Sequence, residues 1–129
     1  MERLLWICLG GAVGSGARYL LSGWVLDRLG PAFPSGTLAV NTLGSFLVGA
    51  LMYLGVEAGM LSPTLRLALT TGGMGGFTTY STFSYETMRY LQDGAWALAL
   101  LNVTVTVVGC LVACFLGWAA AQLVAGPSV

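Results

Sequence analysis

The chain has no histidine, no lysine and few charged residues of any kind. Only 8% of its 129 residues are charged, and all five positive charges are arginines. The three cysteines, Cys8, Cys110 and Cys114, lie in apolar stretches and form no CxxC pair. Zinc sites and disulfide frameworks depend on histidine or on closely spaced cysteines, so neither is expected. We expect the three cysteines to serve as small buried side chains.

The sequence also lacks the residue sets that most enzymes use. It has no Ser/His/Asp or Cys/His set, no phosphate-binding loop and no cluster of metal ligands, so enzymatic activity is not expected. Acidic and basic residues balance to a net charge of +0 without a run of either sign, which argues against nucleic acid as a partner. The apolar stretch after Arg3 continues to Leu26 without an A-x-A-like end, so we expect a retained first helix rather than a cleaved signal peptide.

What the chain has in abundance is hydrophobic residues, at 57%, with a mean hydropathy of +0.84. Both values exceed those of soluble domains and predict that residues 1–129 form one all-α domain in a membrane. A membrane-spanning helix needs roughly 20 apolar residues, and turn-forming residues divide the sequence into four such spans. Their approximate bounds are 4–26, 37–56, 65–91 and 95–124.

The third span contains a cluster of glycine and hydroxyl residues, from Gly72 to Phe83, which reads GGMGGFTTYSTF. Backbone groups freed by a helix break inside a membrane must find partners within the protein, so such a cluster suits a bundle or a pore and not a lipid-facing surface. We predict that the helix is interrupted at Gly72–Gly76. Two interpretations of the glycines stay open: unwound carbonyl oxygens that coordinate a cation such as Na⁺, or close helix crossing.

Small residues four apart predict close contacts elsewhere too, at Gly10 and Gly14 and along Gly109, Ala113, Gly117 and Ala121.

The arginines give no clear orientation in the membrane. Arg3 and Arg66 lie on one side of the predicted spans, and Arg28 and Arg89 lie on the other, whereas an oriented protein has more positive charge on the cytoplasmic side. An antiparallel dimer of identical chains is one hypothesis, and a weakly biased chain oriented by a partner or an insertase is the other.

Arg18 lies inside the first span, where it must be paired, bonded to carbonyls or beside water, unless it is an anchor near the interface.

Polar residues of the second span share one helix face. Thr37, Asn41, Ser45 and Gly49 are spaced four apart, which stacks them in a line. The amide nitrogen of Asn41 has two N–H donors, which suit an anion. The alternative is a structural hydrogen bond to a neighbouring helix, worth about 1 kcal/mol.

Hydroxyl groups and aromatic rings alternate after the glycine cluster. If the helix resumes there, Thr78, Thr82 and Glu86 share an edge, and Tyr80 and Phe83 are neighbours at i, i+3. Ring edges carry partial positive charge, and hydroxyl donors replace part of the hydration shell of an anion. The pattern therefore favours an anion site, with ordinary aromatic packing as the alternative.

Four motifs, in order, give the sequence a family resemblance. They are Gly10, Gly11, Gly14, Arg18 and Tyr19; Gly36, Thr37, Leu38, Val40, Asn41 and Gly44; Gly75 to Phe83; and Asn102 with Thr106. Over essentially its whole length the chain resembles the Fluc (CrcB) family of bacterial fluoride channels. Four matches in the same order make the resemblance specific.

The resemblance implies an antiparallel, dual-topology homodimer in the bacterial cytoplasmic (inner) membrane, with each chain crossing it several times. It further implies passive export of fluoride, and hence fluoride resistance, through two pathways at the dimer interface. The backbone carbonyls of Gly75 and Thr78 from both copies would hold a central structural Na⁺. On the pathway, Asn41 would donate to fluoride, and Tyr80 and Phe83 would present their ring edges to it. Ser81 and Thr82 would belong to a polar track, and Glu86 would lie toward a vestibule. Structural or vestibule positions would be taken by Arg18, Thr37, Asn102 and Thr106.

One position departs from the family pattern: residue 80 is Tyr, where Phe is usual. The departure leaves open a mainly structural subunit of a heterodimeric fluoride channel. A small dual-topology drug/proton antiporter is disfavoured, because it would need an acidic residue in the first span. Between Leu4 and Leu26 there is none.

Overall fold

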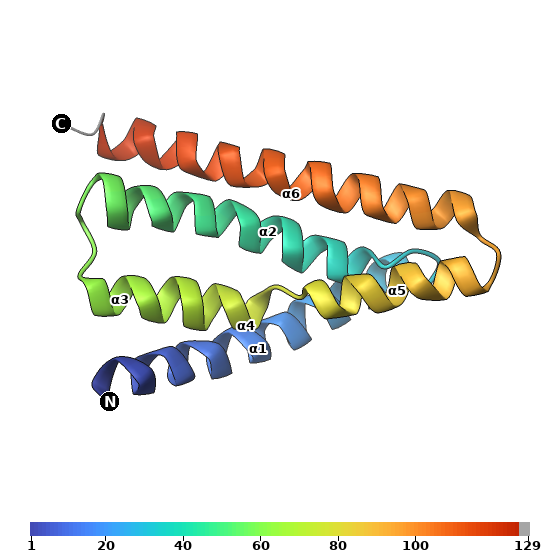
Figure 1. Cartoon of the computed structure of the whole chain (residues 1–129), viewed down its shortest axis with the longest axis horizontal. Helices are drawn as coiled ribbons and strands as arrows, with labels where there is room; N and C mark the ends of the chain where they lie inside the picture. Colours follow the sequence, from blue (N-terminus) through green and yellow to red (C-terminus); the bar gives the residue numbers. More distant parts are fainter. Residues whose placement is uncertain (127–129) are drawn as a thin grey trace.

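The computed structural model describes residues 1–126, and every regular element within that range is a helix. Figure 1 shows the helices in chain order. Their bounds are α1 Glu2–Leu29, α2 Ser35–Met52, η1 Tyr53–Glu57, α3 Pro63–Leu67, η2 Ala68–Met74, α4 Gly75–Phe77, α5 Tyr80–Gln92 and α6 Trp96–Ala125, where η1 and η2 are π-helical. η1 continues α2, η2 and α4 continue α3, and α5 follows after Thr78 and Thr79. Residues 1–126 therefore form four long segments, each called a pass, of which the third runs from α3 to α5.

Three of these passes are helices long and apolar enough to cross a membrane: Glu2–Leu29, Ser35–Glu57 and Trp96–Ala125. The shortest has 23 residues, which at 1.5 Å per residue gives about 35 Å and exceeds the roughly 30 Å of a bilayer core. Large apolar side chains such as Leu20, Leu111 and Phe115 point outward. The prediction of a helical membrane protein is confirmed.

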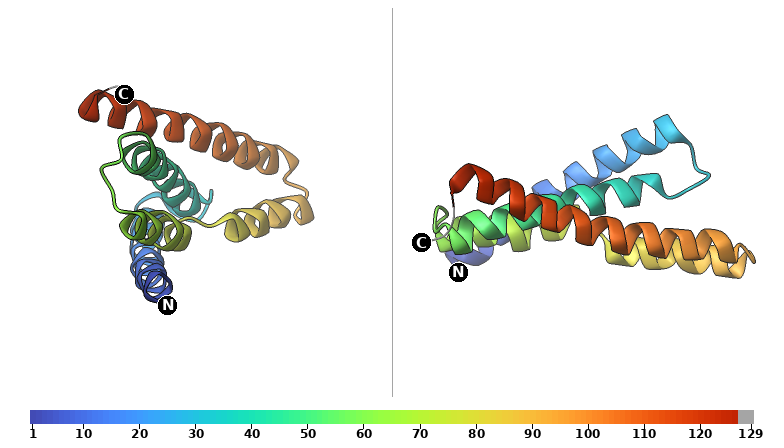
Figure 2. Two further views of the ribbon diagram at one scale, coloured as in Figure 1. Left: turned by 60° about the vertical axis from the view of Figure 1, so that its left-hand side comes forward. Right: turned by 90° about the horizontal axis from the view of Figure 1, so that it is seen from above.

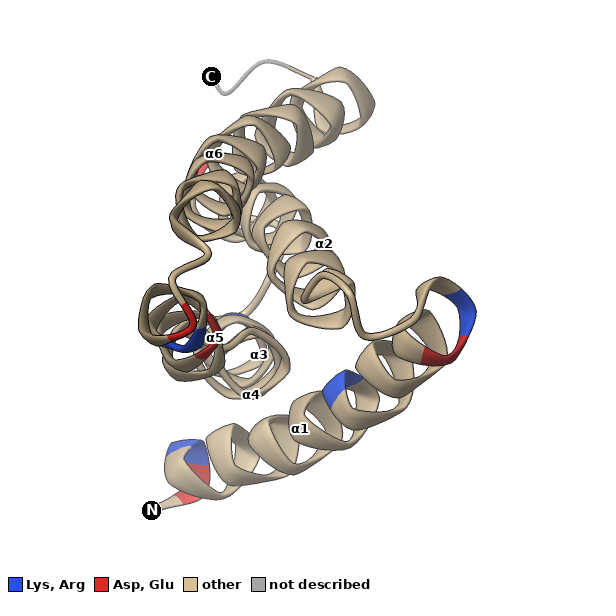
Figure 3. Cartoon of the chain, turned by 90° about the vertical axis from the view of Figure 1, so that its right-hand side faces the viewer, with Lys and Arg blue, Asp and Glu red and all other residues tan. Residues whose placement is uncertain are grey.

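The passes lie side by side, as Figures 1 and 2 show. α6 runs along α2, α2 separates α6 from the α3–α4 segment, and α1 crosses beneath that segment. Figure 3 shows charged residues near both ends of α1 and in α5, with one basic position midway along α1. That position corresponds to Arg18, the arginine nearest the middle of this 28-residue helix. Glu57 at the end of η1 and Arg66 in α3 carry further charges.

The interruption of the third pass lies two residues after the glycine cluster. Gly72–Gly76 stays helical, within η2 and α4. The residues that leave the helix are Thr78, with ψ of 160°, and Thr79, with φ of −149° and ψ of 108°. The predicted break at Gly72–Gly76 is therefore wrong in its position.

The glycines of the third pass instead let it cross α1 at close range. A Cβ atom on Gly72 would overlap the carbonyl oxygen of Ile7, and one on Gly76 would overlap that of Gly11. From the α1 side, a Cβ on Gly14 would overlap the carbonyl oxygen of Gly73. Of the two interpretations left open for Gly72 and Gly76, close helix crossing is the one observed.

The predicted ridge of small residues in α6 packs against α2. A Cβ on Gly117 would overlap the carbonyl oxygen of Phe46, and one on Gly49 would overlap that of Cys114. Ala113 and Ala121 are buried beside them. The cysteines are free. The expectation that all three are buried is wrong, since Cys8 is exposed and Cys110 and Cys114 are half-buried.

Candidate ion pathway

The two non-helical residues of the third pass are held by Asn41 of α2. Its Nδ2 donates to the carbonyl oxygen of Thr79 at 3.0 Å, and the Thr79 N–H donates to Asn41 Oδ1 at 2.7 Å. Both residues are 7% exposed. The amide thus supplies a donor and an acceptor to backbone groups that have left the helix. The structural bond to a neighbouring helix, which was one of the two alternatives for Asn41, is therefore present. The second N–H of Asn41 Nδ2 takes no part in this reciprocal pair.

A cluster of hydroxyl groups surrounds the start of α5. Thr79 Oγ1 accepts from the N–H of Thr82 at 3.2 Å, which caps the helix, and donates to Thr82 Oγ1 at 2.9 Å. Ser81 Oγ lies 3.3 Å from Thr79 Oγ1. The first N–H groups of a helix lack partners within it and carry partial positive charge. The cluster therefore combines hydroxyl donors with a helix end that favours an anion.

Two aromatic rings stand beside this cluster. The ring centroids of Tyr80 and Phe83 lie 5.5 Å apart, with their planes 58° from parallel, so neither ring stacks face to face with the other. Phe83 is 6% exposed and Tyr80 is 79% exposed. The neighbouring placement predicted from their i, i+3 spacing is observed.

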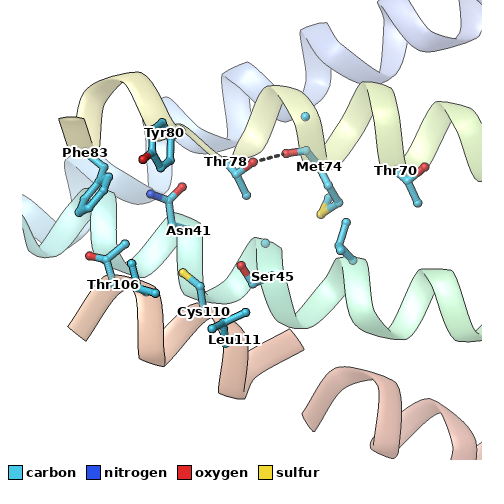
Figure 4. Close-up of a pocket in the computed structure, with 14 residues that line it drawn as sticks. Asn41, Ser45, Thr70, Met74, Thr78, Tyr80, Phe83, Thr106, Cys110 and Leu111 are labelled. Atoms are coloured by element: carbon cyan, nitrogen blue, oxygen red, sulfur yellow. Dashed lines mark hydrogen bonds between the residues drawn. The ribbon is translucent and has the colours of Figure 1, made fainter. Parts of the chain in front are cut away.

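The rings line a cavity of about 540 Å³ between α2, the broken pass and α6. Figure 4 shows Asn41, Tyr80 and Phe83 close together at one end of this cavity, with Thr106 on the facing helix. The other lining residues are Gly44, Ser45, Val48, Thr70, Met74, Gly75, Thr78, Val107, Cys110 and Leu111. The cavity wall is mostly apolar, and three of its polar residues, Asn41, Thr78 and Tyr80, lie at the break or bond to it.

The break leaves the carbonyl oxygens of Gly75, Gly76, Phe77 and Thr78 without their helical donors, and two of these residues, Gly75 and Thr78, line the cavity. In a continuous helix the carbonyls of Gly75 and Thr78 would accept from the N–H groups of Thr79 and Thr82. Those N–H groups donate to Asn41 Oδ1 and Thr79 Oγ1 instead. Oxygen ligands suit a hard cation. The site thus fits the Na⁺ that the family resemblance implies.

Glu86 and Arg18 do not line the 540 Å³ cavity and belong to two other cavities. Thr37 Oγ1 donates to Glu86 Oε1 at 2.6 Å, while Glu86 Oε2 is buried with no hydrogen-bond partner among residues 1–126. Arg18 shares a polar cavity of about 240 Å³ with Thr37, Thr79 and Thr82. The shared edge of Thr82 and Glu86 was predictable from spacing, but the bond from Thr37 was not.

Asn102 of α6 does not line the 540 Å³ cavity and is connected to α5 through Thr87. It is 1% exposed, and its Nδ2 donates to Thr87 Oγ1 at 3.0 Å. Thr87 Oγ1 in turn donates to the carbonyl oxygen of Phe83 at 2.8 Å. Thr106 Oγ1 donates to Asn102 Oδ1 at a longer 3.4 Å. Sequence reasoning missed Thr87, for which the only signal is its four-residue spacing from Phe83.

These residues fall within the part of the chain that a known family covers. The model of the family described as CrcB-like protein, Camphor Resistance (CrcB), matches residues 5–118. The chain belongs to the CrcB family. The resemblance predicted from four motifs is thereby confirmed.

Curated relatives of this CrcB-family chain carry a functional name. A protein of Sorangium cellulosum, named fluoride-specific ion channel FluC, is 54% identical over 98% of this chain and 100% of its own length. Proteins of the same name from Anaeromyxobacter sp. (strain K) and Geotalea daltonii are 55% and 49% identical, over 89% and 96% of this chain and 91% and 100% of their own lengths. The relatives are named as channels and not as enzymes, in agreement with the prediction for this chain.

Proposed function

We propose that this chain forms a fluoride-selective channel that exports fluoride from the bacterial cytoplasm across the inner membrane. The observation that carries the proposal is a set of anion-favouring groups at one break in an otherwise apolar chain: the Asn41 amide, the hydroxyls at the start of α5, and the Tyr80–Phe83 ring pair. The name of the relatives supports fluoride as the anion. Donors and ring edges at close quarters replace the hydration shell of a small anion.

Export by such a channel is passive. A membrane potential that is negative inside favours the exit of an anion by about 2.3 kcal/mol per 100 mV for each charge. In an acidic medium fluoride enters cells as neutral HF, and it is trapped as the anion in the neutral cytoplasm. A selective pore then lowers the internal fluoride concentration and so reduces toxicity.

We further propose that two copies assemble in antiparallel orientation and enclose two pathways. The 79% exposed Tyr80 beside a buried Phe83 supports a partner on that face, as does the even distribution of arginines at the span ends. Reporter fusions at the C-terminus test the orientation. Equal signals from cytoplasmic and periplasmic reporters are expected, and a single orientation would contradict the dual topology.

A structural Na⁺ between the two copies would be held by the free carbonyls of Gly75 and Thr78. Replacing Na⁺ with N-methylglucamine from extraction onward is expected to lower the thermal stability of the dimer, because carbonyl dipoles brought together without a cation repel each other. Thermal melting of the purified protein in the two salts measures the effect. Equal melting temperatures would argue against the cation site.

Fluoride release from liposomes that contain only this purified chain tests the function directly. Release is read with a fluoride electrode after valinomycin shunts the membrane potential, with chloride release as the control. Rapid release of fluoride without chloride is expected. Dimers that release no fluoride would instead favour a mainly structural subunit of a heterodimeric channel.

The aromatic pair gives a prediction about individual side chains. Tyr80→Phe is expected to keep fluoride release within about threefold of wild type, because the ring edge is retained. Phe83→Ile is expected to lower it by about tenfold or more, because the edge contact of a buried ring is lost. Undiminished release by folded Phe83→Ile protein would count against the assigned pathway.

A further inference from the structure

The helix that carries the aromatic pair is separated from the rest of its pass. α5 spans Tyr80–Gln92, and the extended residues Thr78 and Thr79 interrupt the backbone ladder before it. Helical continuity therefore does not fix the rotation of α5 about its own axis. A rotation of about 20° would move a ring roughly 6 Å from the axis by about 2 Å, a shift large enough to open an edge contact with an ion.

Contacts with neighbouring helices set that rotation, among them hydrogen bonds from α2 and α6. Asn41 of α2 holds the start of α5 through Thr79. One turn after Phe83, Asn102 of α6 donates to Thr87 Oγ1, which donates to the Phe83 carbonyl oxygen. An asparagine that is 1% exposed in a membrane helix is costly unless its amide is bonded. Through these two bonds, Asn102 of α6 is connected to the backbone carbonyl of Phe83.

We propose that Asn102 and Thr87 are positioning residues that hold the Phe83 ring in the fluoride pathway and so determine fluoride selectivity. The inference rests on the proposed function. Neither residue lines the large cavity, so any effect they have on fluoride acts through α5. The bonds from Thr37 to Glu86 and from Tyr90 to Ala32 also hold α5, so loss of the Asn102–Thr87 bond loosens the turn that carries Phe83 and weakens the edge contact that fluoride would use.

The same helix provides a matched control. Ser84 Oγ donates to the carbonyl oxygen of Tyr80 at 2.9 Å, which is the same four-residue hydroxyl bond as that of Thr87. Ser84 is exposed, and within residues 1–126 no side chain of another helix donates to its hydroxyl. Removing it deletes the local bond without deleting a connection between helices.

Fluoride and chloride release from liposomes distinguishes loss of the connection between helices from loss of a bond within α5. Thr87→Val keeps the side-chain shape but loses the hydroxyl, and is expected to lower the fluoride-to-chloride ratio of release by about tenfold. Thr87→Ser, which restores the hydroxyl, and Ser84→Ala are each expected to stay within about threefold of wild type. Asn102→Leu should match Thr87→Val, and the double variant should lose no more than either single variant. A wild-type ratio in folded Thr87→Val protein, or equal losses in Thr87→Val and Thr87→Ser, would overturn the proposal.

A second measurement does not depend on transport. Hydrogen–deuterium exchange of the amides at residues 80–87 is expected to quicken by about tenfold in Thr87→Val and to stay unchanged in Ser84→Ala. If wild-type protein releases no fluoride, the proposed function fails, and this measurement still decides whether Asn102 and Thr87 hold α5. Unchanged exchange in Thr87→Val would refute the positioning role, whatever the transport result.

Discussion

Replacing Asn41 with leucine is expected to lower fluoride release by about 100-fold or more. The leucine removes both bonds to Thr79 and leaves a buried N–H and a buried carbonyl without partners. Each unsatisfied group costs about 1–3 kcal/mol, and 1.36 kcal/mol corresponds to tenfold. The start of α5 and the donor on the pathway are lost together. Liposome flux, with the melting temperature of the same preparation, measures the effect.

Two companion variants show which part of the Asn41 amide matters. Asn41→Asp keeps an acceptor for the Thr79 N–H but has no N–H to give to the Thr79 carbonyl or to fluoride. Its release is expected to fall nearly as far as in Asn41→Leu, with a smaller loss of stability. Thr42→Val changes the neighbouring residue of α2 and is expected to behave as wild type. More than half of wild-type release from Asn41→Leu would contradict the assigned role.

Adding a single methyl group at Gly117 is expected to destabilise the bundle by about 3 kcal/mol, at the upper end of what overpacking usually costs. The Cβ of Gly117→Ala would overlap the Phe46 carbonyl oxygen and approach its Cα at 3.1 Å. Because those atoms belong to the backbone of α2, no side-chain rotation relieves the overlap, and α2 and α6 must separate. The yield and melting temperature of folded protein in detergent measure the effect.

Gly16 is the matched control for Gly117. It also lies within a long helix, but nothing lies within 4 Å of a Cβ built on it. Gly16→Ala is therefore expected to leave stability unchanged or to raise it by less than about 1 kcal/mol, through better helix propensity. Similar melting temperatures for Gly117→Ala and Gly16→Ala would show that the close α2–α6 contact contributes little.

The helical membrane class was predictable because it depends on the length and hydropathy of continuous segments. The position of the break was not, because a glycine cluster indicates either unwinding or close crossing. Contact with the carbonyl oxygens of Ile7 and Gly11 in α1 decides between unwinding and close crossing, and these residues lie more than 60 positions earlier in the chain. With α1 so close, Gly72 and Gly76 remain helical, and the chain opens at the next residues for which another helix supplies bonds.

The candidate site was predictable in its residue types and not in its bonds. Spacing placed Asn41 on a polar face, but nothing local indicates that both ends of its amide are used by Thr79, which lies 38 residues away. The one signal for Thr87, its four-residue spacing from Phe83, is not informative, because a threonine within a helix commonly bonds the carbonyl four residues earlier. Its importance comes only from Asn102 on another helix.

The reciprocal bonds between Asn41 and Thr79 have a consequence for how the protein enters the bilayer. Hydrocarbon offers no water to an interrupted helix, and each orphaned backbone group there costs several kcal/mol. Because the same chain satisfies Thr79, a single copy is expected to insert before it meets another. The carbonyls of Gly75 and Thr78, left without their helical donors, then favour pairing once two inserted copies come together with a cation.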